Sequence, residues 1–300
     1  MTRPSLLPTV LRMDILITGL LLGATYSLMA MGLTLQYGVA RIMNLANGEV
    51  LVAGAFAAFW FYTAQQLNPM WALLVAVPLA FVVNWLVYQW LLRPLVRRAK
   101  NRGMLEVDSI LATFGMSFAA VGLMRMAFGG EFFSYSFLAV PLELFGQPFG
   151  LNRVVAAGVA VLVCGLLYLG LTGTRFGMAM RALAVDPRSA GLVAIDVPRM
   201  SAIAFALGGA ISASGGVVLS TFLTLDASIG VLFTMKALII VIMGGVGDVR
   251  GAVLAALILG LTETLVASWV DPGLTLAAAY LLFVLVLLFR PQGLFGRRPS

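Results

Sequence analysis

Apolar stretches long enough to cross a lipid bilayer recur along the whole length of this sequence. A membrane-spanning helix needs roughly 20 consecutive, predominantly apolar residues. The apolar segments lie at about 15–36, 48–62, 71–92, 109–128, 154–171, 201–222, 231–246, 252–270 and 274–289. Because 61% of the residues are hydrophobic and only 10% are charged, the bilayer must be the main solvent of this chain. The sequence therefore predicts an all-α fold, a polytopic transmembrane helical bundle of about 8–9 membrane segments in a single domain over residues 1–300.

A transmembrane β-barrel is the competing architecture for such a composition. Its strands are short and alternate apolar with polar residues. The runs 73–92 and 274–289 are continuously apolar and show no such period. The pattern favours helices.

The residue types that build catalytic and metal centres are scarce in this chain. It has no histidine, which is the commonest zinc and haem ligand and the base of a Ser/His triad. Its single cysteine, Cys164, lies within an apolar run and has no partner for a disulfide in the same chain. The glycines at 244, 245, 247 and 251 are not followed by the G-K-[ST] ending of a phosphate-binding loop and indicate a tight turn instead. We expect no catalytic residue, metal or cofactor in this polypeptide.

The formal charge of +7 could indicate a nucleic-acid partner, but the placement of the charges indicates a membrane topology. Basic residues gather in alternate connections and at the C-terminal end: Arg93, Arg97, Arg98, Lys100 and Arg102, then Arg175, Arg181, Arg188 and Arg199, then Arg290, Arg297 and Arg298. Such clusters mark the cytoplasmic side. The intervening connections, 65–70, 129–150, 223–230 and 270–273, contain no Lys or Arg and are expected to face outward. The expected partner of the surface is membrane lipid, with no nucleic acid.

The first two segments leave two topologies open. If 48–62 crosses fully, the N-terminal side of the first segment, with Arg3 and Arg12, lies outside, against the positive-inside tendency. If 48–62 is broken or re-entrant, that side lies inside.

Small residues repeat every four positions in three of the segments. The sets are Gly19, Gly23 and Ser27, then Gly208, Ser212 and Gly216, then Ala252, Ala256 and Gly260. Lipid is as apolar as leucine, so membrane helices associate by close backbone approach at such stripes. The three sets predict helix–helix contacts.

Polar residues interrupt the apolar pattern between the first two segments. Asn44, Asn47 and Glu49 would be costly to bury without hydrogen-bond partners. One interpretation is a broken helix whose polar turn lines a translocation path, because irregular backbone at membrane depth is tolerated beside protein or a wet cavity. The other is an interfacial loop in which Asn44 or Asn47 caps the next helix.

Charged residues also lie within later apolar segments. Lys236 and Glu263 are predicted to form an interhelical pair, with either a structural or a pathway role, and Arg125 lies near the outer end of its segment. Asp226 and Asp248 are expected to be loop residues.

The basic stretch 174–199 contains Asp186 followed by Pro187, a strong helix-start signal with Asp as N-cap and Pro as the first helical residue. A short helix is expected to run to about Ala194, with Ala190 in its interior.

Four stretches of this sequence resemble branched-chain amino acid ABC permeases of the LivH type. The first is GLTLQYGVARIMNLANGEVLVAG at 32–54, where the family usually has N-x-A-H-G-E; Asn47 replaces the histidine, so the resemblance carries no histidine-dependent role to this position. The others are TRFGMAMRALAVDPRSAGLVAIDVPR at 174–199, MKALIIVIMGGVGDVRGAVLAALILGLTETL at 235–265 and RPQGLFG at 290–296. They occur in the family's order and span most of the chain.

This resemblance implies a multi-pass permease subunit of the bacterial inner membrane, forming the translocation pathway of an ABC importer for leucine, isoleucine and valine. It implies a second homologous permease, two cytoplasmic ATPases that hydrolyse ATP, and a periplasmic or extracellular solute-binding protein. It also implies that the cytoplasmic loop at about 172–199 is a coupling loop that docks on the ATPase, through Arg175, Arg181, Asp186, Pro187, Arg188 and Ala190. The alternatives are import of urea, short amides or other small carboxylates by the same machinery, and a stand-alone secondary transporter or channel.

Overall fold

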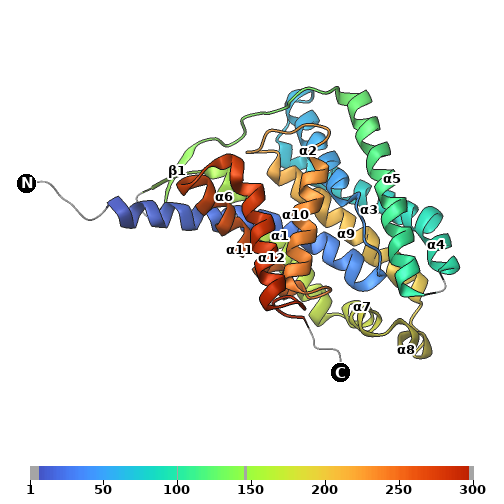
Figure 1. The fold of residues 1–300 in the computed structure, drawn as a ribbon. Coiled ribbons are helices and arrows are strands. Elements are labelled where there is room, and N and C mark those ends of the chain that lie inside the picture. Colours follow the sequence, from blue (N-terminus) through green and yellow to red (C-terminus); the bar gives the residue numbers. More distant parts are fainter. Residues whose placement is uncertain (1–6, 100, 145–146, 297–300) are drawn as a thin grey trace, which may run out of the picture.

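The computed structural model describes residues 7–99, 101–144 and 147–296, without the side chains of 7–12, 102, 144, 147 and 188, and has the predicted helical bundle architecture (Figure 1). Its elements are α1 (Leu7–Ala40), α2 (Asn47–Thr63), η1 (Pro69–Trp71), α3 (Ala72–Val87), η2 (Tyr88–Leu92), α4 (Arg93–Arg98), α5 (Arg102–Phe128), β1 (Pro141–Leu144), β2 (Gln147–Gly150), α6 (Leu151–Gly173), α7 (Arg175–Val185), α8 (Pro187–Leu192), α9 (Val197–Leu219), α10 (Gly230–Gly244), α11 (Val249–Trp269), η3 (Pro272–Leu274) and α12 (Thr275–Phe289).

Seven helical stretches in the described part of the chain are long and apolar enough to cross a membrane, and α10 is a shorter apolar helix of 15 residues. With α2, of 17 residues, they account for the predicted segments. The helices α5, α9 and α11 begin before their apolar runs because a polar side chain caps each of them. The side chain of Asn101, for example, accepts from the Met104 N–H and starts α5 seven residues before the apolar run at Ser109.

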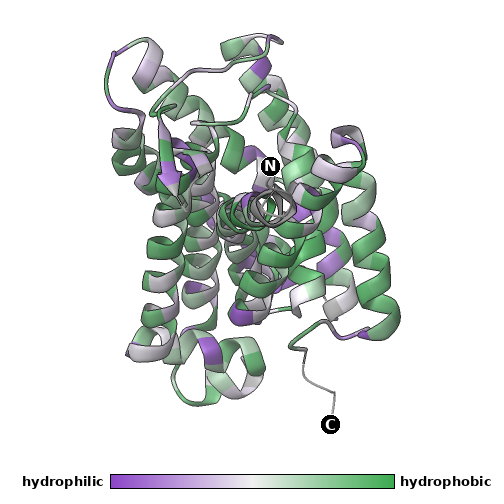
Figure 2. Ribbon diagram, turned by 90° about the vertical axis from the view of Figure 1, so that its left-hand side faces the viewer, coloured by the Kyte–Doolittle hydropathy of each residue, from purple (hydrophilic) through white to green (hydrophobic). Residues whose placement is uncertain are grey.

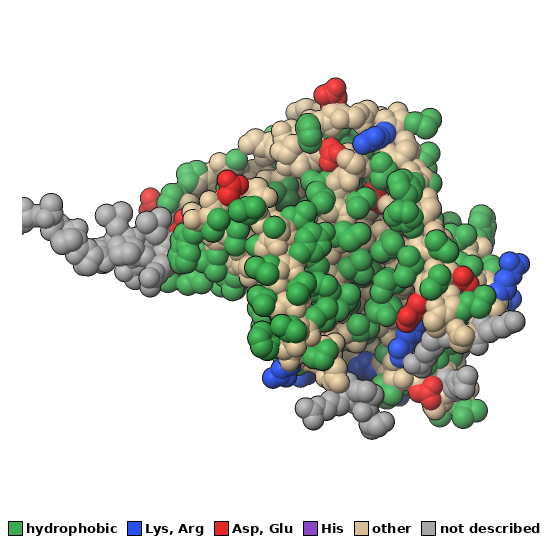
Figure 3. Space-filling view, in the orientation of Figure 1, with side chains coloured by type: hydrophobic (Ala, Val, Ile, Leu, Met, Phe, Trp, Pro, Cys, Tyr) green, Lys and Arg blue, Asp and Glu red, His purple; other side chains and the backbone are tan. Residues whose placement is uncertain are grey.

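The two ends of the bundle differ in their connections. One end, here called the hairpin face, carries the 129–150 connection, in which β1 and β2 pair antiparallel and Phe133 pairs with Leu225. The other end, the α7 face, carries α4, α7 and α8 (Figure 1). Hydrophobic residues follow the helix bodies between these ends (Figure 2), and most of the Lys and Arg side chains visible in Figure 3 lie toward its lower and right-hand edges. The hairpin was not predicted, because four-residue strands are too short to show an alternating pattern.

The path of α1 and α2 decides between the two topologies. The start of α1 lies beside the hairpin (Figure 1), and at its other end Arg41 donates to the Ala184 carbonyl of α7. The second helix, α2, begins inside the bundle and ends at the hairpin face, where the Tyr62 hydroxyl donates to the Ser136 carbonyl at 3.0 Å. The second segment is therefore broken but still crosses the bundle. The non-helical link 41–46 spans the part of the bundle between the end of α1 and the start of α2. The N-terminal side of α1 therefore lies at the hairpin face, as expected for a second segment that crosses, and the expectation that a broken segment would place it on the opposite side is wrong.

Residues of the predicted small-residue stripes lie at close helix contacts. A Cβ on Gly23 would overlap the backbone of Leu257 in α11, and one on Gly260 would overlap the backbone of Gly23. A Cβ on Gly32 would overlap the Gly208 carbonyl of α9, and the reverse holds for Gly208. These contacts bring α1 against α9 and α11 at backbone distance, as lipid-embedded packing requires.

The two halves of the bundle repeat one arrangement in opposite directions. In the first half α1, the link and α2 lead into α3, which packs on α9; in the second, α9, a link and α10 lead into α11, which packs on α1. The helices α1 and α9 run antiparallel, since Leu28 lies near Gly215 and Gln36 near Gly208. Both short helices, α2 and α10, therefore start inside the bundle and point to opposite faces.

The glycine cluster forms the expected tight turn. Gly245 and Gly247 have φ of 107° and 81°, in the region where a side chain would be strained. The C-terminal signature packs on this turn, because the N–H groups of Leu294 and Phe295 donate to the Met243 and Gly244 carbonyls at 2.8 and 3.1 Å.

Candidate functional site

The non-helical link 41–46 between α1 and α2, together with the first turn of α2 through Glu49, is here called the break; its polar residues Asn44, Asn47 and Glu49 are buried. Asn44 donates through Nδ2 to Gln36 Oε1 at 3.0 Å, and its Oδ1 accepts from the Ala46 N–H at 3.0 Å. Ala46 occupies the N-cap of α2 without a side-chain cap, and Asn47 is already the first helical residue. Asn44 and Asn47 are 1% and 0% exposed. The interfacial-cap interpretation is therefore wrong. These polar side chains are buried and hydrogen-bond to other residues of the bundle interior.

The start of α2 is bound to three other helices. Asn47 Oδ1 accepts from Ser212 Oγ of α9 at 2.8 Å, and Asn47 Nδ2 lies 3.4 Å from the Met29 carbonyl of α1. The Gly48 N–H, which has no partner within its own helix, donates to Thr234 Oγ1 of α10 at 2.8 Å. Side chains 165 and 186 residues away in sequence thus stabilise this helix end.

Glu49 is the acidic group of the break and is 2% exposed. Its Oε1 accepts from Ser117 Oγ of α5 at 3.0 Å, whereas its buried Oε2 has no hydrogen-bond partner among the described residues. The carboxylate lies against Gly230, where a Cβ would overlap it. One acceptor of this carboxylate is therefore available for a donor that the described residues do not supply.

The position of Glu49 favours the carboxylate form at this depth. It lies in the first turn of α2 and beside Gly230, the first residue of α10. Helix N-terminal ends carry partial positive charge and stabilise carboxylates. The N-terminal ends of two short helices, running to opposite faces, therefore meet at one carboxylate.

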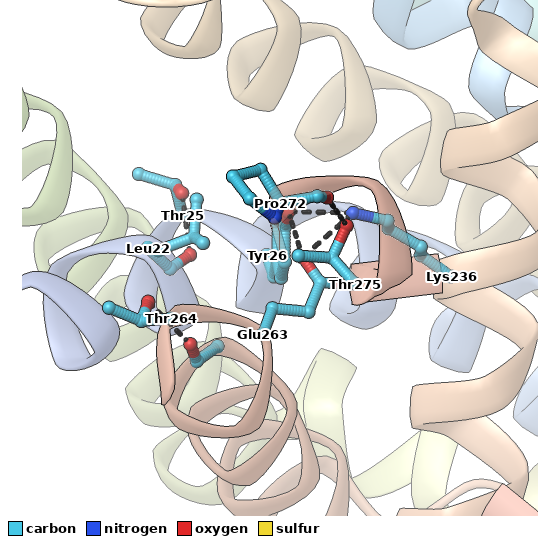
Figure 4. Close-up of polar contacts among 9 residues, drawn as sticks. Leu22, Thr25, Tyr26, Lys236, Glu263, Thr264, Pro272 and Thr275 are labelled. Carbon is cyan, nitrogen blue, oxygen red and sulfur yellow. Dashed lines mark hydrogen bonds and ion pairs between the residues drawn. The ribbon is translucent and has the colours of Figure 1, made fainter. Parts of the chain in front are cut away.

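The second polar cluster is the predicted interhelical pair (Figure 4). Lys236 Nζ lies 2.8 Å from Glu263 Oε2, and their side chains are 16% and 5% exposed. The Tyr26 hydroxyl of α1 donates to the same Glu263 oxygen at 2.8 Å and accepts from Lys236 Nζ at 2.9 Å. Glu263 Oε1 is buried and has no hydrogen-bond partner among the described residues. The pair is confirmed, with Tyr26 as a third member that links α1, α10 and α11.

The two clusters do not form one site, although both involve α10. Thr234 faces the break and Lys236 faces Glu263. Residues two apart on a helix with 3.6 residues per turn point in nearly opposite directions, about 200° apart. The five residues that the sequence grouped as a pathway therefore divide into the break, with Asn44, Asn47 and Glu49, and the ion pair on the opposite side of α10.

On the α7 face, 175–192 folds into two short helices. Thr174 Oγ1 accepts from the Gly177 N–H at 3.0 Å and starts α7. As predicted, α8 begins at Pro187; it ends at Leu192, two residues before the expected Ala194, which has a positive φ of 62°. Ser189 Oγ donates to Asp186 Oδ2 at 2.6 Å.

The two helices pack on the bundle by one side only. Ala190 is buried beside Met180 and Leu183, whereas Arg175 and Arg181 are exposed. The side chain of Arg188 lies outside the described part. Large apolar side chains point outward from this element: Val185 is 68% exposed, Leu192 88% and Val193 68%. The element therefore presents an apolar surface flanked by arginines.

The hairpin face contains a hollow of about 380 Å³ lined by Tyr135, Asn152, Arg153 and Thr221, among others. The Tyr135 hydroxyl lies 2.7 Å from Ser220 Oγ. Burial raises the pKa of Tyr135 to about 12, so the phenol stays neutral and keeps this hydrogen bond at physiological pH.

Comparison with known proteins identifies the family. The family described as branched-chain amino acid transport system / permease component matches residues 15–289. The chain belongs to this family. Among its relatives, the high-affinity branched-chain amino acid transport system permease protein LivH of Salmonella typhimurium is 28% identical over 93% of this chain and 94% of the relative. LivH of Escherichia coli K12 is 29% identical over 93% and 94%, and BraD of Pseudomonas aeruginosa is 29% identical over 94% and 95%.

Membership fixes the general role of the molecule. It is a permease subunit of an ABC importer and a multi-pass protein of the inner membrane, not an enzyme, and ATP is hydrolysed by partner subunits. Permeases of this kind work with ATPase and binding-protein partners.

Sequence reasoning missed several polar residues of this permease that complete the two clusters. Gln36, Ser117 and Thr234 bind the break, and Tyr26 binds the ion pair. Ser212 was assigned to packing alone and also holds Asn47. Each is a polar residue inside an apolar segment, which is the signal that could have identified it.

Proposed function

We propose that this permease forms half of the translocation pathway of an importer for leucine, isoleucine and valine. The observation that carries the proposal is the match to the branched-chain permease family over 15–289, which spans nearly every helix of the bundle. The names of the LivH and BraD relatives support the same cargo.

The proposed assembly contains a second, similar permease, two cytoplasmic ATPases and an external solute-binding protein. The α7–α8 element is the proposed contact with an ATPase, since its outward Leu192 and Val193 are costly to leave in water and the exposed Arg175 and Arg181 can pair with acidic groups. The hollow at the hairpin face, which contains Arg153, is the proposed place where cargo arrives from the binding protein.

Within the membrane, the break is the proposed cargo-sensing part of the pathway. Glu49 Oε2 has an unfilled acceptor, and the ammonium group of an amino acid is the donor that a free carboxylate oxygen would take. Asn44 and Asn47 hold the backbone of the break in position. For Lys236 and Glu263 a pathway role remains a proposal, and it competes with a structural role.

Transport is tested with the complete importer in proteoliposomes, loaded internally with ATP. We expect uptake of radiolabelled leucine that unlabelled isoleucine and valine suppress and that urea and acetamide do not. Uptake of labelled urea or acetamide in place of leucine would overturn the proposed cargo.

The ATPase contact is tested by Leu192→Asp, with Leu192→Met as a matched control that keeps an apolar side chain. Burying a leucine side chain contributes about 1.5–3 kcal/mol, so the aspartate variant should bind the ATPase roughly 10- to 100-fold more weakly. The methionine variant should bind as the unmodified permease does. Equal ATPase co-purification with both variants would show that α8 is not the contact.

A further inference from the structure

A groove of about 510 Å³ lies between α3, with the π turn η2, and the start of α9, away from the break and the ion pair. Four large apolar side chains line it: Phe81, Val82, Trp85 and Ile203. Val82 and Trp85 are 50% and 38% exposed and lie in a helix that is long and apolar enough to span a membrane, so these side chains face lipid. Residues three and four apart share one helix face, so this wall continues the lipid-facing side of α3. The groove is thus open to acyl chains.

The end of the groove nearest the α7 face carries charge. Arg93 and Arg199 line it together with Gln89 and Asp196. Arg93 Nη1 donates to Gln89 Oε1 at 2.8 Å, and Arg93 Nε is buried with no hydrogen-bond partner among the described residues. Asp196 Oδ1 accepts from the Arg199 N–H at 3.1 Å and caps α9. Two guanidinium groups and a helix N-terminal end outweigh one carboxylate, so this end favours an anion.

We propose that this groove binds an anionic phospholipid, with its phosphate at Arg93 and Arg199 and an acyl chain along Phe81, Val82 and Trp85. Arg93 and Arg199 both line the groove, and phosphate matches the geometry of a guanidinium donor. The rise from Phe81 to Arg93 is roughly 18 Å of helix, which is long enough for a headgroup and the upper part of a chain. A bound lipid would join α3 to the start of α9, directly after α8.

The combination of features selects this ligand. A soluble anion uses the arginines and leaves the apolar walls unexplained. A zwitterionic lipid also carries a phosphate, but its own ammonium group offsets that charge, so it gains less from two arginines. Basic pockets between membrane helices at the cytoplasmic side are suited to anionic headgroups. An anionic lipid therefore matches both parts of the groove best.

The complete importer, reconstituted in nanodiscs of phosphatidylcholine with phosphatidylglycerol, tests the proposal by native mass spectrometry of the retained lipid. An arginine in contact with an anionic headgroup contributes about fivefold to its binding, so Arg93→Gln and Arg199→Gln should each lower phosphatidylglycerol retention about fivefold. Arg97→Gln is the matched control, because Arg97 is an exposed arginine of α4 outside the groove and should leave retention unchanged.

A second variant keeps the test decisive if an arginine variant does not fold. Val82→Trp fills the apolar part, retains both charges and should lower the retention of phosphatidylglycerol. Equal phosphatidylglycerol retention in the groove variants and in Arg97→Gln would overturn the proposal. Displacement of the lipid by millimolar inorganic phosphate would assign the groove to a soluble anion, and loss of the ATPase with unchanged lipid retention would assign it to a subunit interface; either result overturns it.

Discussion

Breaking the Lys236–Glu263 pair tests what holds α1, α10 and α11 together. Lys236→Met removes the cation and leaves the Glu263 carboxylate, whose side chain is 5% exposed, with the Tyr26 hydroxyl as its remaining donor. Removing one partner of a buried pair costs about 3–5 kcal/mol. Because the Lys236 side chain is 16% exposed, some solvent screening remains, and we expect the lower end, about 3 kcal/mol of unfolding free energy.

The double variant Lys236→Met with Glu263→Met separates the pair from the cost of an unpaired charge. It leaves no buried ion, and such replacements are often neutral or stabilising. We therefore expect it to recover most of the stability that Lys236→Met loses. Tyr26→Phe removes one hydroxyl and should cost about 1 kcal/mol.

SDS-induced unfolding of the detergent-purified permease measures these differences, and leucine uptake by the reconstituted importer measures their effect on transport. If the pair is structural, the double variant regains both stability and uptake; if it serves the pathway, it regains stability alone. An unfolding free energy of Lys236→Met within about 0.5 kcal/mol of the unmodified permease would refute the reasoning, because leaving a desolvated carboxylate without its cation should destabilise the fold by more than this.

Three further changes test the break and the topology. Gly48→Ala places a Cβ into the Gly230 carbonyl and should abolish stable folding, whereas Gly115→Ala meets nothing within 4 Å and should be tolerated, as expression and thermal unfolding will show. Glu49→Gln keeps the shape and removes the charge; losing a charged hydrogen bond of about 1.5–3 kcal/mol should raise the KM for leucine roughly 10- to 100-fold, and an unchanged KM would exclude contact with the ammonium group. Single cysteines at Ser134 and Ser189, with the native cysteine replaced, should react with an impermeant reagent from opposite sides of intact cells; labelling of both from outside would contradict the assigned topology.

Charge and hydropathy predicted the membrane bundle, its alternating loops and the polar interruption at 41–49, because they report the solvent that each segment meets. The ion pair could also be predicted, since an isolated Lys236 and an isolated Glu263 in apolar segments each require a partner. The start of α8 at Pro187 followed from local chemistry alone.

Charge and hydropathy do not predict which neighbour, protein or lipid, each segment contacts. The helices α9 and α12 are both strongly apolar, yet 89% of the α9 span is buried inside this chain and only 6% of the α12 span is. Lipid and protein interior are equally apolar, so hydropathy does not distinguish a helix at the centre of the bundle from one at its edge.

The sequence by itself determined that Asn47 and Glu49 need polar partners, and only the tertiary structure decided that Ser212, Thr234 and Ser117 supply bonds at this break. Likewise, the antiparallel packing of the two halves, and not any local pattern, brings the starts of α2 and α10 together. The physical reason is that desolvation makes a partner obligatory from composition alone, whereas its identity depends on backbone approach between segments 68 to 186 residues apart in sequence.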